Sequence, residues 1–430
     1  MNNKNHTLCS YRYFNRVYGL DQLLDAIRDK RTNPTIPLGP TLASFIVGLM
    51  SGLYSFNELE EAIRDGDFNK FICNAKLPSA DSYADIFTKC NTDDLEELSV
   101  RIVQKARHNK ALKSNTIEGW KVIGIDGFHS FTMRSERLGE TAHRYTTENK
   151  DGTEQTDYRE FAVGASYIGS APRLMLKIKR VPQDEGELTA AKRLVDELNE
   201  DYYQYCDVIA VDSLYANAPF INTVLENKKE VIARIKQEKT DLIKDAEGLF
   251  KKREPDHIFT DVTPKDKNPT SGTFYDLEIW DEEDFKIWDK VKSPLRVLKV
   301  KERRKEINAA GEKINEEEQV CYFLTTLSIN QMKSFLVWKI AHRRWDEENS
   351  HFHWLKTYWN LDRRYSHKPE VIQVVYILFV IAFNLFHLYL YRNLRSFEHK
   401  RQTKKGFIRK FYRGLVRLTE YLYSPTRSPG

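Results

Sequence analysis

The order of apolar and amphipathic segments between residues 119 and 236 constrains the fold more than any other feature of this chain. Short apolar or alternating runs predict strands, and longer stretches with helical spacing predict helices. In chain order they are strand 120–125, strand 159–168, strand 173–181, helix 185–202, strand 207–211, helix 219–227 and strand 230–235. This order predicts a mixed α/β sheet, in which the first and fourth strands can lie parallel and adjacent.

Two of these predicted strands are followed directly by an aspartate. Asp126 comes after Ile123–Ile125, and Asp212 comes after Val208–Val211. Because parallel strands end at the same edge of a sheet, both aspartates are predicted at the edge where binding sites gather. Asp-Gly is a common turn and Asp-Ser a common helix cap, so neither aspartate indicates a site by itself.

A third acid, Glu348, lies on a predicted helix that begins before Arg344. At about 100° per residue, one face of this helix is partly apolar and is predicted to pack on the sheet edge. That face carries Arg344, Glu348, His351, Phe352 and Leu355. Glu347 is the rival acid, but it points about 100° away from this face. The alternative for Arg344 and Glu348 is a surface pair that stabilises the helix by about half a kcal/mol.

Carboxylates in the order Asp, Asp, Glu on strand, strand and helix match the requirements of a two-metal phosphoryl-transfer site. Oxygen ligands of this kind suit Mg²⁺ or Mn²⁺. Asp126, Asp212 and Glu348 are therefore the predicted catalytic and metal-binding residues. Arg344 is predicted to meet a phosphate or to hold Glu348, and an enzyme that cuts and joins DNA is the leading hypothesis.

The remaining sequence indicates several structural parts around this core. Residues 238–325 alternate charged turns with short β-type runs, which predicts a β-rich insertion within the α/β domain. The predicted parts are a helical, DNA-binding domain at 1–115, a first core part at 116–237, the insertion at 238–325, a second core part at 326–395 and a basic C-terminal segment at 396–430.

Composition limits the compartment and the partners. The formal net charge of +5 permits binding to nucleic acid without indicating it. The five cysteines are dispersed, with no Cys-x-x-Cys pair, which argues against a zinc site or a disulfide framework and favours a reducing cytoplasm. Residues 371–391 have the length to span a bilayer. Gln373, Asn384 and His387 interrupt them, so we expect a buried core helix and no membrane association.

Several of these segments together resemble the DDE transposases of bacterial insertion sequences, of the insertion-sequence-4 type. The resemblance spans most of the chain, and its most specific part is the segment around Glu348. The segments that carry it are Leu77–Asp81, Ile125–Gly127, Gly186–Glu187 with Ala190–Leu194, Val211–Ser213, Arg344–Asn349 with Phe352, Leu355–Lys356, Trp359, Leu361–Asp362 and His367, and Asn384–Leu385 with Arg392. The chain has Ala341 where the family signature has tyrosine, and Lys356 lies one position after the signature lysine.

The resemblance implies a ribonuclease-H-like core with a β insertion before the glutamate. It implies that Asp126, Asp212 and Glu348 bind two Mg²⁺ or Mn²⁺ ions and that Arg344 and Lys356 contact phosphates. Double-stranded DNA, as element ends and as target, would be the substrate. A homodimer assembled on DNA and a prokaryotic, nucleoid-associated cytoplasmic location follow from the same resemblance.

Two further groups of residues are candidates for contact with DNA. Trp280 and Trp288 lie in the insertion, where the family tends to place contacts with DNA ends and an aromatic ring can hold an unstacked base. Core packing is the alternative for both. The basic C-terminal segment contains the predicted phosphate contacts Lys404, Lys405, Arg409 and Lys410. A solvated amphipathic helix is the alternative for that segment.

Other functions stay open on the sequence. A catalytically silent DNA-binding protein with the same fold, or a ribonuclease-H-like nuclease that cuts without joining, has the same predicted core. The intact set of Asp126, Asp212 and Glu348 argues against the first of these. Inverted repeats on both sides of the gene would favour the transposase over both.

Overall fold

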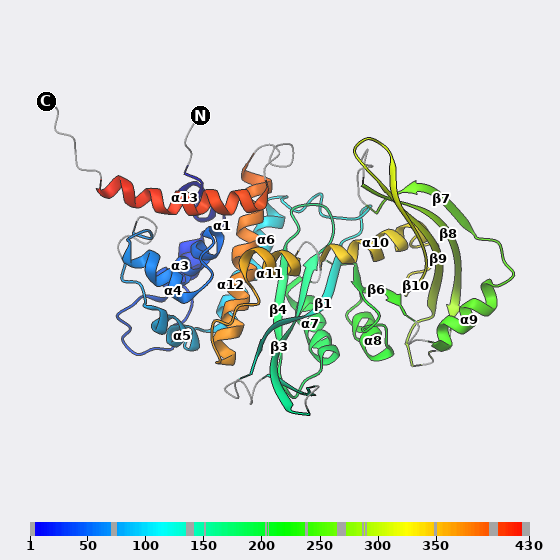
Figure 1. Cartoon of the computed structure of the whole chain (residues 1–430), viewed down its shortest axis with the longest axis horizontal. Helices are drawn as coiled ribbons and strands as arrows, with labels where there is room; N and C mark the ends of the chain where they lie inside the picture. Colours follow the sequence, from blue (N-terminus) through cyan, green and yellow to red (C-terminus); the bar gives the residue numbers. More distant parts are fainter. Residues whose placement is uncertain are drawn as a thin grey trace.

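Ten strands form one continuous sheet that runs through most of the molecule (Figure 1). The structure is a computed structural model. It describes residues 5–69, 75–134, 142–149, 152–202, 204, 206–236, 240–264, 272–285, 288, 290–347, 351–394 and 403–423. The strands follow the order β2-β3-β1-β5-β6-β10-β9-β8-β7, with β4 paired to β3. Together with the helices around it, this sheet confirms the predicted α/β class.

The centre of the sheet is parallel, as the sequence predicted. Strand β1 pairs parallel with β5, and β5 pairs parallel with β6. Strand β3 lies antiparallel on the other side of β1, and β4 forms a hairpin with it. The bounds are β1 Val122–Met133, β2 His143–Glu148, β3 Glu154–Tyr167, β4 Met175–Val181, β5 Val208–Val211 and β6 Glu230–Ile235.

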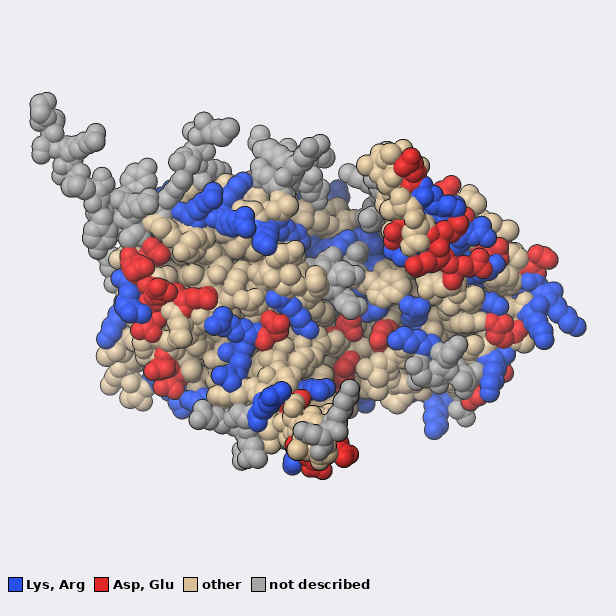
Figure 2. Space-filling view, viewed as in Figure 1, with Lys and Arg blue, Asp and Glu red and all other residues tan. Residues whose placement is uncertain are grey.

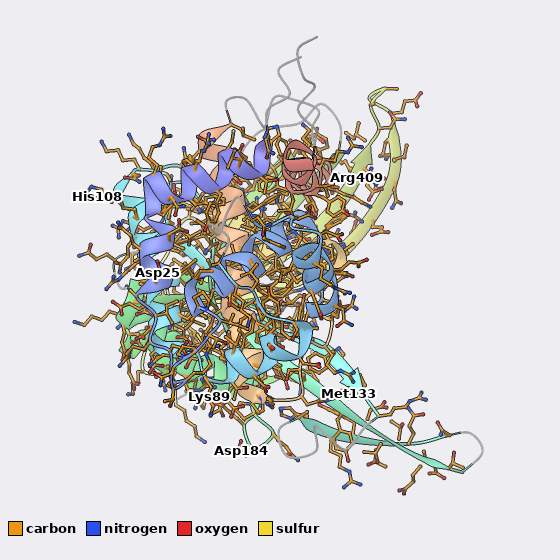
Figure 3. All side chains as sticks on the ribbon, turned by 90° about the vertical axis from the view of Figure 1, so that its left-hand side faces the viewer. Asp25, Lys89, His108, Met133, Asp184 and Arg409 are labelled. Carbon is orange, nitrogen blue, oxygen red and sulfur yellow. The ribbon has the colours of Figure 1, made fainter. Side chains whose placement is uncertain are left out.

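Strand β1 is longer than predicted, and the expectation that it ends at Asp126 was wrong. It continues to Met133 because the residues after Asp126 keep pairing with β3, up to the pair Met133 and Tyr158. Strand β2 pairs with the first half of β3 and extends this pairing outward. Figure 3 shows the resulting arm projecting from the body of the molecule, with Met133 labelled at its base.

The predicted β-rich insertion forms, and its strands extend the core sheet. Strand β10 pairs antiparallel with β6, so that Leu324 lies opposite Ala233. Strands β9, β8 and β7 then add antiparallel in turn. The bounds are β7 His257–Val262, β8 Gly272–Phe285, β9 Leu295–Ile307 and β10 Lys313–Thr325. The core and the insertion therefore share one hydrogen-bonded backbone network.

Helices cover the sheet and form a bundle at one end of it (Figure 1). The N-terminal helices are α1 His6–Tyr18, α2 Leu20–Asp25, α3 Leu38–Ser51, α4 Phe56–Arg64, α5 Ala80–Thr88 and α6 Thr92–His108. Helices α7 Glu187–Tyr202, α8 Ala218–Glu226 and α9 Thr240–Phe250 follow strands of the sheet. The later helices are α10 Ser334–Glu347, α11 His353–Trp359, α12 Pro369–Leu388, a π-helical turn Tyr389–Asn393 and α13 Lys404–Tyr423.

Helix α12 joins the N-terminal bundle to the sheet. It contacts α3, α5 and α6 on one side and β4 on the other. The segment Pro369–Asn393 is long and apolar enough to cross a membrane, and 94% of its most apolar window is buried inside the protein. The Asn384 amide bonds both the N–H and the carbonyl of Met175 on β4. This burial and this polar contact match the predicted core helix.

Candidate functional site

Asp126 and Asp212 follow the stretch over which β1 and β5 pair in parallel, on two neighbouring strands. The register pairs Gly124 with Ala210, so each aspartate comes two residues beyond a paired position. The N–H of Gly127 donates to Asp126 Oδ1 at 3.0 Å, and the N–H of Leu214 donates to Asp212 Oδ1 at 2.8 Å. The structure thus brings together the first two predicted acids as the strand pattern required.

Both aspartates line a pocket of about 530 Å³ whose other charged residues are cations. Helices α10 and α11 and strands β1 and β6 contribute its walls. The lining residues are Asp126, Gly127, Phe128, His129, Asp212, Ser213, Arg234, Lys236, Arg344, Trp345, Phe352, His353 and Lys356. A pocket with two carboxylates at its base and four cations around them suits a phosphate diester held by divalent ions.

Arg344 reaches into this pocket from α10. Its Nη1 lies 3.0 Å from Asp126 Oδ2, and both side chains are largely buried. The described contact is with Asp126, and the predicted contact with a phosphate or with Glu348 stays a prediction because Glu348 lies outside the described residues. Arg344 therefore fixes the orientation of the Asp126 carboxylate and contributes a guanidinium to the pocket wall.

The residues after α10 anchor α11 on the sheet. The ring of Phe352 stacks on that of Phe128, with the centroids 4.4 Å apart. A side chain at Gly164 on β3 would overlap the Phe352 ring, so this glycine allows the close approach. His351 Nδ1 lies 3.2 Å from Ser166 Oγ, and Leu355 is fully buried. The predicted helix face is confirmed for its described members.

Glu348, the third predicted acid, lies outside the described residues, as do the side chains of Asp346 and Glu347. Among the residues that the structure describes, no three His, Cys, Asp or Glu side chains are close enough to hold a metal ion together. The two described carboxylates supply the hard oxygen donors that Mg²⁺ and Mn²⁺ prefer. Asp126 and Asp212 thus have the chemistry expected of two protein ligands of such an ion. That Glu348, and not Glu347, is the third ligand stays a prediction.

Glu187 and Tyr215 form a contact behind the pocket residue Gly127, which the sequence analysis did not assign to the site. The hydroxyl of Tyr215 donates to Glu187 Oε1 at 2.6 Å. Burial raises the pKa of Glu187, the Tyr215 hydroxyl lowers it, and the charge of Asp212 raises it further. Burial also raises the pKa of Tyr215 well above its ordinary value, and the charges of Glu187, Asp126 and Asp212 contribute in the same direction. The charge of Asp212 therefore acts on both side chains, and that of Asp126 acts on Tyr215.

Arg234 and Lys236 were also missed, although the rule used for the aspartates would have found them. They lie at the carboxyl end of β6, the third parallel strand. The guanidinium of Arg234 lies 5.3 Å from the centroid of the Trp345 ring. This contact links β6 to α10 at the wall of the pocket, which both residues line.

A buried cluster in the insertion holds α10 in place. Glu302 on β9 is fully buried and accepts hydrogen bonds from Trp338 Nε1 and Gln319 Nε2, each at 2.8 Å. Its Oε1 also lies 2.8 Å from His342 Nε2. Trp338 and His342 lie on the same helix as Arg344. These hydrogen bonds lower the pKa of Glu302 against the effect of its burial.

The predicted phosphate contacts at the C-terminus lie apart from the pocket, and they differ from one another. Lys404 lies over the ring of Trp354, and burial lowers its pKa to about 8. Lys410 lies over the ring of Phe407. Lys405 and Arg409 are exposed and line a separate pocket of about 700 Å³ between α4, α11 and α13. In Figure 2 the basic side chains run along α13 on this face.

The other predicted contacts divide between the pocket and the insertion. Lys356 lines the pocket, with its ammonium 5.4 Å from the centroid of the Phe128 ring. Trp280 lies on β8, and its Nε1 donates to the carbonyl of Arg253 at 2.7 Å. The ammonium of Lys299 lies 5.3 Å from the Trp280 ring centroid. Trp280 and Trp288 pack against the hydrophobic core. This agrees with core packing, the alternative to DNA contact that the sequence left open for both residues.

Comparison with known families gives one match. The model of one family, described as "Transposase DDE domain", matches residues 169–385, which is just over half of the chain. The matched range contains Asp212, Arg344 and the position of Glu348, and it begins after Asp126. No curated protein matches the chain.

Proposed function

Because this chain belongs to the transposases with a DDE domain, we propose that it binds the ends of its own mobile element and moves that element by DNA strand cleavage and strand transfer. The observation that carries the proposal is the register of β1 and β5, which sets Asp126 beside Asp212 in a cation-lined pocket. We place the chain in the insertion-sequence-4 type because of the segment from Arg344 to Lys356.

In the proposed reaction the chain orients a DNA phosphodiester against a nucleophile. The nucleophile is a water molecule in cleavage and a 3′-hydroxyl in strand transfer, and the departing 3′-oxygen leaves on the opposite side of the phosphorus. Transposases of this family normally use divalent metal ions, and Asp126, Asp212 and Glu348 would hold two Mg²⁺ or Mn²⁺ ions that activate the nucleophile and stabilise the leaving oxygen. Arg344, with Arg234 across the pocket, would hold the phosphate oxygens.

The partners and the location follow from this activity. Two element ends must be brought together before they are joined to a target, so we propose a homodimer assembled on DNA. Lys405 and Arg409 on α13 would contact the phosphates of the duplex. A nucleoid-associated cytoplasmic protein without a membrane span is consistent with the burial of α12.

A strand-cleavage assay tests the proposal. The purified chain would be incubated with Mg²⁺ and duplexes that carry the sequences flanking its gene. We expect cleavage and strand transfer by the wild type, and loss of both by at least about a thousandfold in Asp126→Asn, Asp212→Asn and Glu348→Gln, since removal of a metal ligand or an electrostatic stabiliser has effects of this order. Each variant should still bind the duplex.

The matched control is Asp207→Asn. Asp207 precedes β5 at its other end and accepts from the N–H of Lys121 at 2.9 Å, a bond that asparagine can keep. It should cleave like the wild type. Retained cleavage in any of the three site variants would remove that residue from the site. Binding without cleavage by the wild type would identify a silent DNA-binding protein, and cleavage without joining would identify a nuclease.

A further inference from the structure

Glu187 lies against Gly127, the residue after Asp126, and is bonded to Tyr215, three residues after Asp212, without belonging to the predicted set. It begins α7, and Tyr215, its hydrogen-bond partner, follows Asp212 by three residues and is fully buried. The carboxylate is thus tied by a hydrogen bond to the loop that carries Asp212. Acids are common in the first turn of a helix, where the helix dipole stabilises them, so position alone would explain Glu187 structurally.

The contact with Gly127 goes beyond that structural role. A Cβ atom at this position would overlap the carboxylate carbon and both carboxylate oxygens of Glu187. The carboxylate therefore lies flat against the backbone of the residue that follows Asp126. Gly127 has an ordinary extended backbone within β1, so the space above its Cα, and not its backbone conformation, explains the glycine.

Charge at this point of the molecule is unbalanced within the described residues. Asp126 pairs with Arg344, but there neither Asp212 nor Glu187 forms an ion pair with a cation. A half-buried carboxylate beside other carboxylates is unfavourable unless a positive charge joins them. Tyr215 donates to one oxygen of Glu187, both carboxylate oxygens lie next to Gly127, and the residue keeps part of its surface exposed.

We propose that Glu187 is a positioning residue for the metal site of Asp126 and Asp212, acting through a hydrogen bond to water on a bound divalent ion. The proposal rests on the proposed function, because it takes the metal site from it. Magnesium keeps several of its waters when bound to proteins, and these waters need acceptors. Acceptors of this kind orient the ion, and their removal typically changes its affinity by about 10- to 100-fold. Tyr215 fixes the direction of the acceptor, and Gly127 leaves room for it.

Metal affinity of the full-length protein without DNA tests this role. Isothermal titration with Mn²⁺ should show about 10- to 100-fold weaker binding in Glu187→Gln than in the wild type. Tyr215→Phe should weaken binding about fivefold, the size of one hydrogen bond. Gly127→Ala keeps every charge and displaces only the carboxylate, so it should also weaken binding. The control is Glu185→Gln, which removes a carboxylate two residues earlier that pairs with Arg193.

Thermal unfolding separates positioning from a structural role. Mn²⁺ should raise the Tm of the wild type by ligand linkage and raise that of Glu187→Gln much less. Without metal, Glu187→Gln should melt at or above the wild-type temperature, because it removes a like charge. Equal Mn²⁺ affinity in the wild type and Glu187→Gln would overturn the inference. An equal loss of Tm with and without metal would do the same, because Glu187 would then be purely structural.

The proposed function can fail separately. A wild type that binds Mn²⁺ with the expected dependence on Glu187 but leaves every duplex uncut would contradict the transposase and keep the positioning role. A wild type that cleaves DNA, with Glu187→Gln binding Mn²⁺ as tightly as it does, would contradict the positioning role and keep the transposase.

Discussion

The insertion and the carboxyl edge of the core differ in how their charged side chains are paired. In the insertion, charged side chains pair across neighbouring strands, as Lys305 does with Asp276 and Lys301 with Glu318. At the carboxyl edge of the core, Asp212, Arg234 and Lys236 converge on one pocket, and none of them forms an ion pair within the described residues. Figure 2 shows blue and red side chains intermingled on the insertion. Paired charge in the insertion stabilises its strands, whereas the unpaired charges at the core edge are available to a bound ligand.

The buried pair Arg296 and Asp281 is the extreme case of structural charge. Two hydrogen bonds, at 2.8 and 2.6 Å, join the guanidinium on β9 to the carboxylate on β8, and both side chains are almost fully buried. The same guanidinium donates to the carbonyl of Met332, just before α10. The pair therefore connects two strands of the insertion to the helix that carries Arg344.

The largest effect is expected from breaking this pair. Asp281→Ala should lower the free energy of unfolding by about 3–5 kcal/mol, because it leaves the Arg296 charge buried without its partner. Urea denaturation of the purified protein measures the change. Glu97→Ala, which breaks the exposed pair of α6 with Arg101, should change the stability by less than about 1 kcal/mol. A decrease below about 1 kcal/mol in Asp281→Ala would remove the proposed difference between the insertion and the core edge.

Neutralising a carboxylate at the core edge should not lower the free energy of unfolding, in contrast to Asp281→Ala. Asp212→Asn should leave the free energy of unfolding unchanged or raise it by up to about 1 kcal/mol, because active-site charges are often held at a cost in stability. The asparagine oxygen can keep the bond from the N–H of Leu214. Urea denaturation without divalent ions gives the comparison. A destabilisation as large as that of Asp281→Ala would mean that Asp212 is structural charge as well.

The smallest effect is expected on α13. This helix carries one cation whose ammonium is largely buried, Lys404, and two exposed cations, Lys405 and Arg409. Lys405→Gln and Arg409→Gln should each flatten the log–log salt dependence of DNA affinity by about 0.9 for each phosphate that the side chain neutralises. Lys404→Gln should change that slope less, because its ammonium lies over Trp354 with a pKa of about 8 and loses its charge as the pH rises through that value. Binding isotherms at several salt concentrations, at a pH of about 7 and of about 9, measure both.

The preference between end sequences should survive all three α13 changes, because phosphate contacts position a protein without reading sequence. Equal slopes for Lys404→Gln and Lys405→Gln would show that burial of the ammonium does not matter on this helix. An unchanged slope in every variant would assign the phosphate contacts to another surface, for which the basic end of α6 is the next candidate. Figure 3 shows that end at His108, on the side of the molecule away from Arg409.

Local sequence pattern predicted much of the core and the first two acids. The bounds of β6 agree with the predicted strand 230–235, because turn residues flank a short apolar segment there. Asp126 and Asp212 meet as predicted, since parallel strands bring their ends to one edge. The face of Arg344 and Phe352 was predictable from helical spacing alone.

Contacts between distant segments were not predictable in this way. The extension of β1 to Met133 depends on pairing with β3, and the seam between β6 and β10 depends on a strand far along the chain. Glu187 appears in the sequence only as an acid before a helix, and its place beside Asp126 requires the packing of α7 against β3. The burial of Lys404 depends on Trp354, which a basic run does not reveal.

The seam between β6 and β10 also sets the order in which the chain can fold during its synthesis. Strand β6 leaves the ribosome as an apolar edge with unpaired backbone groups, and its partner residues Tyr322–Thr325 come roughly 90 residues later, which is about 5–20 s of elongation. Such an edge is prone to aggregation until it is covered. While the insertion is still being synthesised, β5 pairs with one edge of β6, and the other edge of β6 has no partner strand. The insertion, when complete, is what closes it.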